Sequence, residues 1–150
     1  MSKQFHPTSI IHNGSEIEDN VIIGPYSIIG PNVKSNKNTK VHSHVIIVGN
    51  TTIGFNNEIY PFSAIGSDPQ HLKYDGELTE LIIGNHNIFR EHVTSHPGTN
   101  IGTKKTIIGN NGFFMVGSHV AHDCIVGNNV VFVNNGVIGG HVEISDYVYL

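Results

Sequence analysis

Residues 108–150 read IGNNGFFMVGSHVAHDCIVGNNVVFVNNGVIGGHVEISDYVYL, and an apolar residue recurs in this stretch at every sixth position. The members of this column are Ile108, Phe114, Val120, Val126, Phe132, Ile138, Ile144 and Leu150. The same step of six runs earlier from Ile11 to Ile65, where Ser35 is the one residue of the column that is not aliphatic. A fixed period over most of a chain indicates a repeat architecture, in which each repeat is one structural unit.

The residues between the apolar positions give the repeat a physical cause. Glycine often follows the apolar residue and asparagine often fills the next positions, so that the chain holds 17 glycines and 17 asparagines. Both residues tolerate positive φ at low cost, which lets the chain turn after each short strand. Three hexapeptides would then close one triangular coil, and stacked coils would share a continuous core. We therefore predict an all-β parallel β-helix of roughly seven coils.

Composition excludes several classes of protein. A chain of 150 residues is expected to form one domain, residues 1–150. The net charge of −4, with only 8 lysines and arginines, gives no electrostatic reason to expect nucleic acid as a partner. No apolar run approaches the roughly 20 residues of a membrane-spanning helix, and the N-terminus does not resemble a signal peptide, so we expect a cytoplasmic protein without a membrane span. The single cysteine, Cys124, cannot form an internal disulfide.

The period fails twice. Residues 66–82 contain SDPQHLKYDGELTEL, where the positions in step are His71 and Glu77, so we predict a loop that projects from the coil. Between Phe89 and Ile108 the phase slips by one residue, through a segment that carries His92 and His96. In a repeat protein such insertions map to surface loops, often on the binding face, and loops on a rigid scaffold often carry function.

Residues that can perform chemistry gather in the segment SHVAHDC, at positions 118–124. His122 and Asp123 take places that turn residues usually fill, and His119 precedes the core position. Gly140 follows His122 by one coil of the repeat, and His141 is its neighbour in sequence. We therefore expect a histidine, a carboxylate, a glycine amide and a second histidine to converge within about two coil spacings of ~5 Å each.

These motifs together resemble the LpxA family of UDP-N-acetylglucosamine O-acyltransferases, within the superfamily of hexapeptide-repeat transferases. The motifs are HPTSII at residues 6–11, QHLKYDGE at 70–77, TSHPGT at 94–99, HVAHDC at 119–124 and GHV at 140–142. The resemblance covers nearly all of the chain. It implies that the β-helix is left-handed, a sense that the usual rule for parallel crossovers does not predict.

The resemblance also implies an activity, the first step of lipid A synthesis. A (R)-3-hydroxyacyl group would pass from acyl carrier protein to the 3-hydroxyl of UDP-N-acetylglucosamine, with no cofactor, no metal and no covalent enzyme intermediate. By similarity His122 is the general base, Asp123 orients it, and the Gly140 N–H stabilises the oxyanion. The residues that would line the substrate pocket are Gln70, Lys73, His96, His119 and His141. A homotrimer with active sites between subunits is implied as well.

The chain departs from the family at two motif positions. His71 stands where aspartate is common, and Pro97 stands where arginine is common. The family's chain continues for several more coils and a helical region, so we expect this sequence to be an N-terminal fragment. Because Leu150 occupies the core column, we expect the isolated fragment to order its last coil poorly and to lack acyl transfer.

Three other functions remain as alternatives. An N-acyltransferase of the same pathway or an acetyltransferase would share the hexapeptides, but we would not expect the QHLKYDGE and HVAHDC motifs in either. A γ-class carbonic anhydrase would hold zinc through three histidines, but its His-x-x-x-x-His spacing is absent from the sequence. A structural solenoid without catalysis is the third. The histidines outside these motifs are expected to be solvated. Cys124 stands two residues before the core position Val126, where small or β-branched residues recur, and it is expected to pack in the core.

Overall fold

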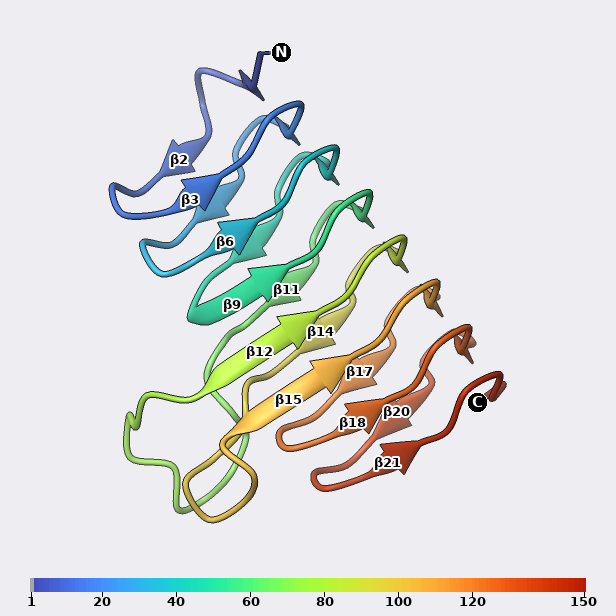
Figure 1. Ribbon diagram of the computed structural model, residues 1–150. Helices are drawn as coiled ribbons and strands as arrows, with labels where there is room; N and C mark the ends of the chain where they lie inside the picture. The colour runs from blue at the N-terminus through green and yellow to red at the C-terminus, as the bar shows by residue number, and fades with distance from the viewer. Residues whose placement is uncertain (1) are drawn as a thin grey trace.

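The computed structural model describes residues 2–150, and it shows a left-handed parallel β-helix without helical segments in that range. The coils form three parallel sheets of 7 strands each, so the prediction of roughly seven coils is confirmed. Figure 1 shows the coils stacked along one axis, with the two termini at opposite ends. No described residue belongs to a helix that is long and apolar enough to cross a membrane.

Each coil contributes one short strand to each sheet. The first sheet consists of β1 (Gln4–Phe5), β4 (Ile22–Ile23), β7 (Lys40–Val41), β10 (Glu58–Ile59), β13 (Ile88–Phe89), β16 (Phe113–Phe114) and β19 (Val131–Phe132). The second consists of β2 (Ile10–Ile11), β5 (Ile28–Ile29), β8 (Ile46–Ile47), β11 (Ala64–Ile65), β14 (Thr94–Ser95), β17 (His119–Val120) and β20 (Val137–Ile138). The third consists of β3 (Glu16–Ile17), β6 (Lys34–Ser35), β9 (Asn50–Ile53), β12 (Glu80–Ile83), β15 (Lys105–Ile108), β18 (Ile125–Val126) and β21 (Glu143–Ile144).

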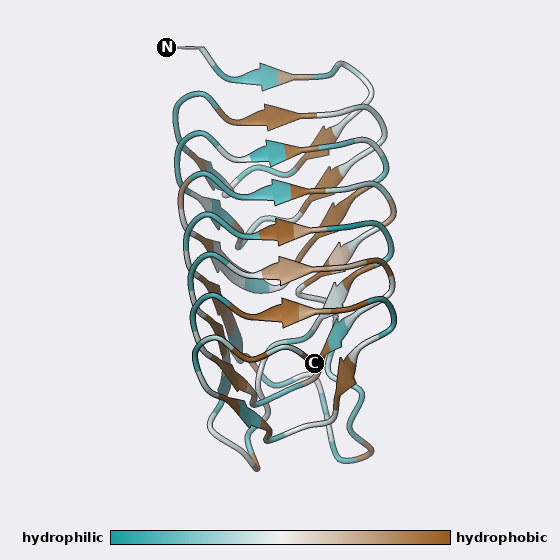
Figure 2. Ribbon diagram, turned by 90° about the vertical axis from the view of Figure 1, so that its right-hand side faces the viewer, coloured by the Kyte–Doolittle hydropathy of each residue, from teal (hydrophilic) through white to brown (hydrophobic). Residues whose placement is uncertain are grey.

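The six-step column forms the core because the parallel register places its members directly above one another. Ile29 lies beside Ile11 and Ile47 in neighbouring coils, and most residues of the column are buried. Phe89, Phe114 and Phe132 stack in the interior, with ring centroids 4.8 Å and 5.1 Å apart. Figure 2 shows the stacked coils, with hydrophobic residues concentrated in the strands and hydrophilic ones in many of the turns. Burial of this ladder of apolar side chains in the inner coils stabilises the scaffold.

The corners between strands explain the abundance of asparagine. Among residues 2–150, fifteen non-glycine residues have positive φ, and asparagine and histidine make up most of them. Asparagine visits the left-handed region more readily than most residues, so it suits these corners. Asp123 and His141 occupy two such corners, with φ of 59° and 65°. Residues that the sequence marked as chemical therefore sit at the bends, where their side chains project from the coil.

Both breaks of the period are loops, and both leave the coil at the same corner. The first follows β11 and ends where β12 begins at Glu80, so residues 80–82 of the predicted loop belong to a strand, with Leu81 fully buried. The second loop, residues 96–104, connects β14 to β15. Figure 1 shows the two loops extending side by side from the middle coils. Each loop therefore lies on a path from the second sheet to the third.

Candidate active site

The predicted site residues meet along one edge of the stacked triangular coils. The corner between the second and third sheets carries the two loops on consecutive coils, then His122 and Asp123 between β17 and β18, then Gly140 and His141 between β20 and β21. Four successive coils thus present their irregular segments on one edge. The repeat itself brings together residues that are far apart in sequence, as the spacing predicted.

A buried histidine–carboxylate pair lies at the centre of this edge. His122 Nδ1 is 2.8 Å from Asp123 Oδ2, and both residues are buried. Because the ionised carboxylate only accepts hydrogen bonds, Nδ1 carries the proton and the lone pair of a neutral His122 is on Nε2. Asp123 thus fixes the tautomer and orientation that a general base requires. The resemblance to the family implied this pairing, and the roles of general base and orienting carboxylate stay a prediction.

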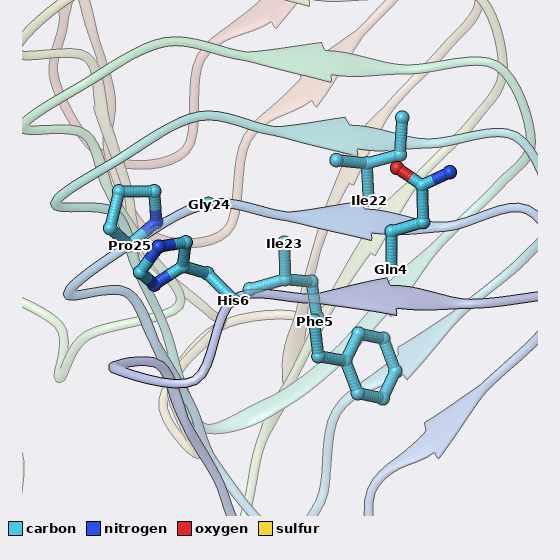
Figure 3. Close-up of a pocket in the computed structure, with 7 residues that line it drawn as sticks. All are labelled: Gln4, Phe5, His6, Ile22, Ile23, Gly24 and Pro25. Atoms are coloured by element: carbon cyan, nitrogen blue, oxygen red, sulfur yellow. The ribbon is translucent and has the colours of Figure 1, made fainter.

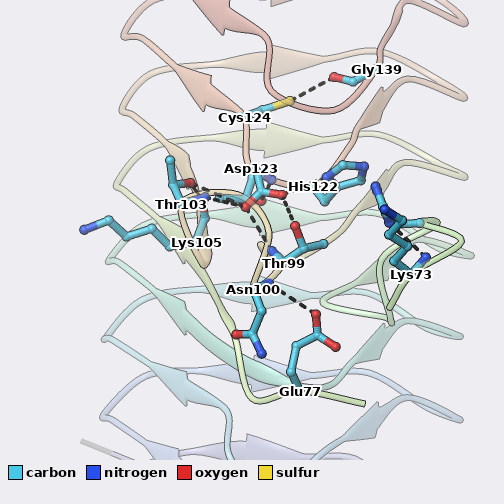
Figure 4. Close-up of polar contacts among 12 residues, drawn as sticks. Lys73, Glu77, Thr99, Asn100, Thr103, Lys105, His122, Asp123, Cys124 and Gly139 are labelled. Carbon is cyan, nitrogen blue, oxygen red and sulfur yellow. Dashed lines mark hydrogen bonds and ion pairs between the residues drawn. The ribbon is translucent and has the colours of Figure 1, made fainter. Parts of the chain in front are cut away.

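The second loop encloses the Asp123 carboxylate. Backbone N–H groups of Thr99 and Thr103 donate to Oδ1 over 2.9 Å and 3.0 Å, and the Thr99 hydroxyl donates to Oδ2 over 2.6 Å (Figure 4). A Cβ on residue 102 would overlap the carboxylate, so Gly102 is required for the close approach of the loop. Sequence reasoning missed these three residues, although the slip in the period marked their loop.

These hydrogen bonds keep Asp123 ionised. Burial by itself raises the pKa of a carboxyl group, but donation from Thr99 and His122 outweighs burial and holds the pKa of Asp123 below its ordinary value. The site therefore contains a fixed negative charge beside His122. Such a charge stabilises the imidazolium that forms when His122 accepts a proton.

Gly140 lies directly against the face of His122. A Cβ on residue 140 would overlap the Cε1 and Nε2 atoms of the imidazole ring, so only glycine leaves room for the ring in this position. The Gly140 N–H donates to no acceptor within residues 2–150. The sequence assigned this glycine to close approach of a substrate carbonyl, and the structure adds a second reason, since the glycine seats the base.

Two further imidazoles flank His122. The ring centroids of His71 and His122 are 5.2 Å apart, and those of His122 and His141 are 5.0 Å apart, with the planes nearly perpendicular in both pairs. His71 comes from the first loop, where its Nδ1 accepts a hydrogen bond of 3.0 Å from the Lys73 N–H. The sequence marked His71 as an in-step position of the first loop and as a departure from the family pattern. The structure places its ring against that of His122.

His96 and His119 form a second imidazole pair on the adjoining coils. Their ring centroids lie 4.9 Å apart, and His119 Nδ1 is 2.7 Å from the Thr94 hydroxyl. His96 is buried, and its Nδ1 has no partner in the described part of the chain. Burial, together with the neighbouring His119 and His122, lowers the pKa of His96 to about 4. Burial also lowers the pKa of His119. Both rings are therefore suited to hydrogen bonding in the neutral form.

The low pKa of His96 predicts a dependence of stability on pH. An unfolded histidine titrates near 6.5, whereas His96 in the folded chain stays neutral down to about 4. At lower pH the unfolded chain binds a proton at this histidine more readily than the folded chain does, which favours unfolding. The stability associated with a neutral His96 is therefore fully present above about pH 6.5 and is lost as the pH falls towards 4. In His96→Gln, the decrease in the free energy of unfolding between pH 7 and pH 4.5 should be smaller by about 1–3 kcal/mol. Urea unfolding at both pH values measures it.

The matched control for His96 is the exposed His12, whose ring lies on the surface and not in the buried histidine cluster. His12→Gln should lose as much stability on acidification as the unchanged chain. An equal loss in His96→Gln and in the control would contradict the assignment of a neutral, buried imidazole at position 96.

Two of the predicted pocket residues are not drawn into the histidine cluster. Gln70 and Lys73 are exposed on the first loop, and their side chains make no hydrogen bond or ion pair within residues 2–150. The loop is nevertheless anchored to the second loop, because Glu77 Oε2 accepts a hydrogen bond of 3.1 Å from the Asn100 N–H. Two backbone hydrogen bonds, from Asp75 and Asn100, hold the pKa of Glu77 below its ordinary value. Cys124 is buried as predicted, with its thiol 3.1 Å from the Gly139 carbonyl.

A shallow pocket lies elsewhere, at the N-terminal end of the molecule. Figure 3 shows its lining, which comes from β1, β4 and the residues that follow them: Gln4, Phe5, His6, Ile22, Ile23, Gly24 and Pro25. None of these belongs to the edge that carries His122. The chemistry of the histidine cluster, rather than this concavity, therefore defines the candidate active site.

The left-handed coil of hexapeptides, with a histidine–carboxylate pair at one edge, places the protein in the class of hexapeptide-repeat β-helices.

No family model matches the chain. Among curated proteins it is 45% identical over 146 residues to the acyl-(acyl-carrier-protein)–UDP-N-acetylglucosamine O-acyltransferase of Thermodesulfovibrio yellowstonii, covering 97% of this chain and 57% of that protein. It is 48% identical over 137 residues to the enzyme of the same name from Syntrophobacter fumaroxidans, covering 91% of this chain and 53% of that one.

Solved structures agree. The LpxA of Acinetobacter baumannii superposes with a TM-score of 0.96 at 49% identity, covering 97% of this chain and 56% of that one. The LpxA of Moraxella catarrhalis superposes with a TM-score of 0.95 at 48% identity, over 97% and 56% of the two chains. The chain belongs to the LpxA family, and it spans about half the length of the curated relatives that it matches.

Proposed function

We propose that the protein transfers an (R)-3-hydroxyacyl group from acyl carrier protein to the 3-hydroxyl of UDP-N-acetylglucosamine, the first step of lipid A synthesis. The observation that carries the proposal is the orientation of His122, whose Nδ1 is held by Asp123 while its ring rests on Gly140. The names of the relatives supply the donor and the acceptor.

The first chemical task is to activate a hydroxyl group. A sugar hydroxyl is a weak nucleophile, and a positioned neutral imidazole can remove its proton as it attacks the thioester. The Nε2 lone pair of His122 serves this purpose because Nδ1 is committed to Asp123. The imidazolium formed in this step would be stabilised by the buried carboxylate of Asp123, which hydrogen bonds from Thr99 help to keep ionised.

The second task is to stabilise the oxyanion that forms on the thioester carbonyl. A preorganised N–H donor aimed at that oxygen is the usual solution, and its removal typically costs 10²–10³ in rate. The Gly140 N–H fits this role because no acceptor within residues 2–150 occupies it. Its closeness to His122 would place the oxyanion donor and the base on the same side of the reacting carbonyl.

The surrounding polar groups would bind the two substrates. His119 and the neutral His96 offer ring nitrogens to sugar hydroxyls or carbonyl groups, and the exposed His141 completes the edge. Gln70 and Lys73 would contact the acceptor or the donor from the first loop. Histidine, carboxylate and amide suffice for this acyl transfer, so the proposal includes no cofactor, no catalytic metal and no covalent intermediate on the enzyme.

The assembly and the location belong to the proposal as well. We propose a cytoplasmic homotrimer in which the edge that carries His122 faces a neighbouring subunit. The exposed part of the first loop is consistent with a site that a second subunit completes.

The activity is tested by product formation in the complete protein. Incubation with UDP-N-acetylglucosamine and (R)-3-hydroxyacyl carrier protein should yield UDP-sugar that is heavier by one hydroxyacyl group, with free thiol on the carrier. Mass spectrometry of the nucleotide sugar and a thiol assay measure the two products. Glucosamine-1-phosphate and UDP-glucose serve as acceptor controls. Transfer to the free amine of glucosamine-1-phosphate, shown by a product that resists mild base, would favour the N-acyltransferase instead.

A further inference from the structure

The first loop is joined to the second loop through one carboxylate. Glu77 accepts a hydrogen bond of 2.8 Å at Oε1 from the Asp75 N–H of its own turn, and one of 3.1 Å at Oε2 from the Asn100 N–H of the second loop. We propose that Glu77 is a positioning residue, which latches the first loop to the second and thereby holds His71 beside His122. The part of this inference that concerns catalysis rests on the proposed function, whereas the latch itself does not.

The chemistry of the side chain suits a latch between two segments. A carboxylate only accepts hydrogen bonds and has two oxygens, so it can bridge two N–H donors, whereas a glutamine has one acceptor oxygen. The bonds from Asp75 and Asn100 favour the charged form and hold the pKa of Glu77 below its ordinary value. Glu77 is therefore ionised at neutral pH, and hydrogen bonds to an ionised group are the stronger kind.

The second loop gives the latch a fixed anchor. Asn100 directly follows Thr99, whose N–H and hydroxyl both donate to the buried Asp123 carboxylate. Figure 4 shows Glu77, Asn100, Thr99 and Asp123 in succession, with dashed lines from the first loop to the second and from the second loop to the carboxylate. Because the bonds to Asp123 do not involve Glu77, the second loop should keep its place when the latch is removed.

The first loop depends on the latch far more. The bond from Asn100 to Glu77 is the one hydrogen bond that joins residues 66–79 to residues 96–104 in the described part of the chain. Within the first loop, the Tyr74 N–H donates to the His71 carbonyl over 2.9 Å, and the Tyr74 hydroxyl donates to the Glu77 carbonyl over 3.3 Å. These bonds connect His71 to Glu77, so the placement of one carries over to the other.

Release of the loop is measured first and without substrate, by limited digestion of the complete protein with trypsin. Lys73 is exposed on the first loop, and cleavage after it reports how often the loop opens. We expect this cleavage to be about tenfold faster in Glu77→Ala, the usual effect of losing a hydrogen bond to a charged group. Mass spectrometry of the fragment that ends at Lys73 measures the rate.

The matched control is Asp75→Ala, which removes another carboxylate from the same loop. The Asp75 side chain makes no hydrogen bond or ion pair within residues 2–150, and alanine keeps the N–H that donates to Glu77. Its cleavage rate should equal that of the unchanged protein. An unchanged rate in Glu77→Ala, or an equal acceleration in Asp75→Ala, would overturn the latch.

Kinetics then test the positioning role. In Glu77→Ala we expect the KM for UDP-N-acetylglucosamine to rise about tenfold while kcat changes by less than about threefold, because His122 and Asp123 keep their contacts and the first loop does not. Glu77→Gln retains one acceptor oxygen and should give an intermediate KM. A role in stability alone would lower the amount of active protein, and hence kcat, at constant KM.

An unchanged KM in a Glu77→Ala protein whose loop is cleaved faster would mean that the loop position does not serve the acceptor, and the positioning role would be wrong. A protein without acyl transfer, in which Glu77→Ala still accelerates cleavage, would contradict the proposed function and leave the latch standing.

Discussion

Replacing His122 by alanine is expected to lower turnover of acyl transfer by about 10²–10⁴, the usual contribution of a general base. The loss should appear in the rate of transfer rather than in the fold, because His122 occupies a corner of the coil and not the six-step core column. Asp123 keeps its hydrogen bonds from Thr99 and Thr103 in the variant, so the second loop remains anchored. Steady-state kinetics of the complete protein measure the effect.

A melting curve must show that His122→Ala is as stable as the unchanged enzyme, so that a loss of turnover is not a loss of folded protein. The unchanged enzyme should also lose rate at low pH, as the base becomes protonated, because only neutral imidazole accepts a proton. A folded His122→Ala protein that retains more than about a tenth of the original turnover would show that another group is the base.

Replacing Gly140 by alanine is expected to lower turnover by about 10²-fold, because the added Cβ must displace the His122 ring. Misplacement of a catalytic group by about 1 Å is enough for a loss of this size. The Gly140 N–H is retained in alanine, so the loss would report the position of the base and not the removal of the oxyanion donor. Kinetics at saturating substrate measure the change.

A melting curve of Gly140→Ala shows whether the substitution changes stability as well as turnover. Undiminished turnover in a folded Gly140→Ala protein would mean that the ring of His122 can move aside without consequence, and the seating role of Gly140 would be wrong.

The fold could be predicted from the sequence because one signal repeats in every coil. Each member of the apolar column occupies the same position in its strand, so a single misread residue such as Ser35 does not change the register; it is buried like its neighbours. The convergence of His122 with Gly140 followed from the same period. The handedness did not, and it came from resemblance to a family.

The remainder of the site lies where the period stops. Thr99 and Thr103 reach Asp123 only because the second loop folds back over the carboxylate, and no spacing rule predicts the path of an irregular loop. His71 lies beside His122 for the same kind of reason. The end of the first loop was also placed too late, because Leu81 continues the alternation of a strand that begins at Glu80.

The most direct test of the account is a double-mutant cycle that measures turnover in the unchanged enzyme, His122→Ala, Gly140→Ala and the double variant. If Gly140 acts by seating the catalytic imidazole, the second substitution should cost little once the ring is gone, so the double variant should be about as slow as His122→Ala alone. If the two losses instead multiply, so that the double variant is slower than His122→Ala by the full factor of Gly140→Ala, then His122 resting on Gly140 is not the catalytic unit.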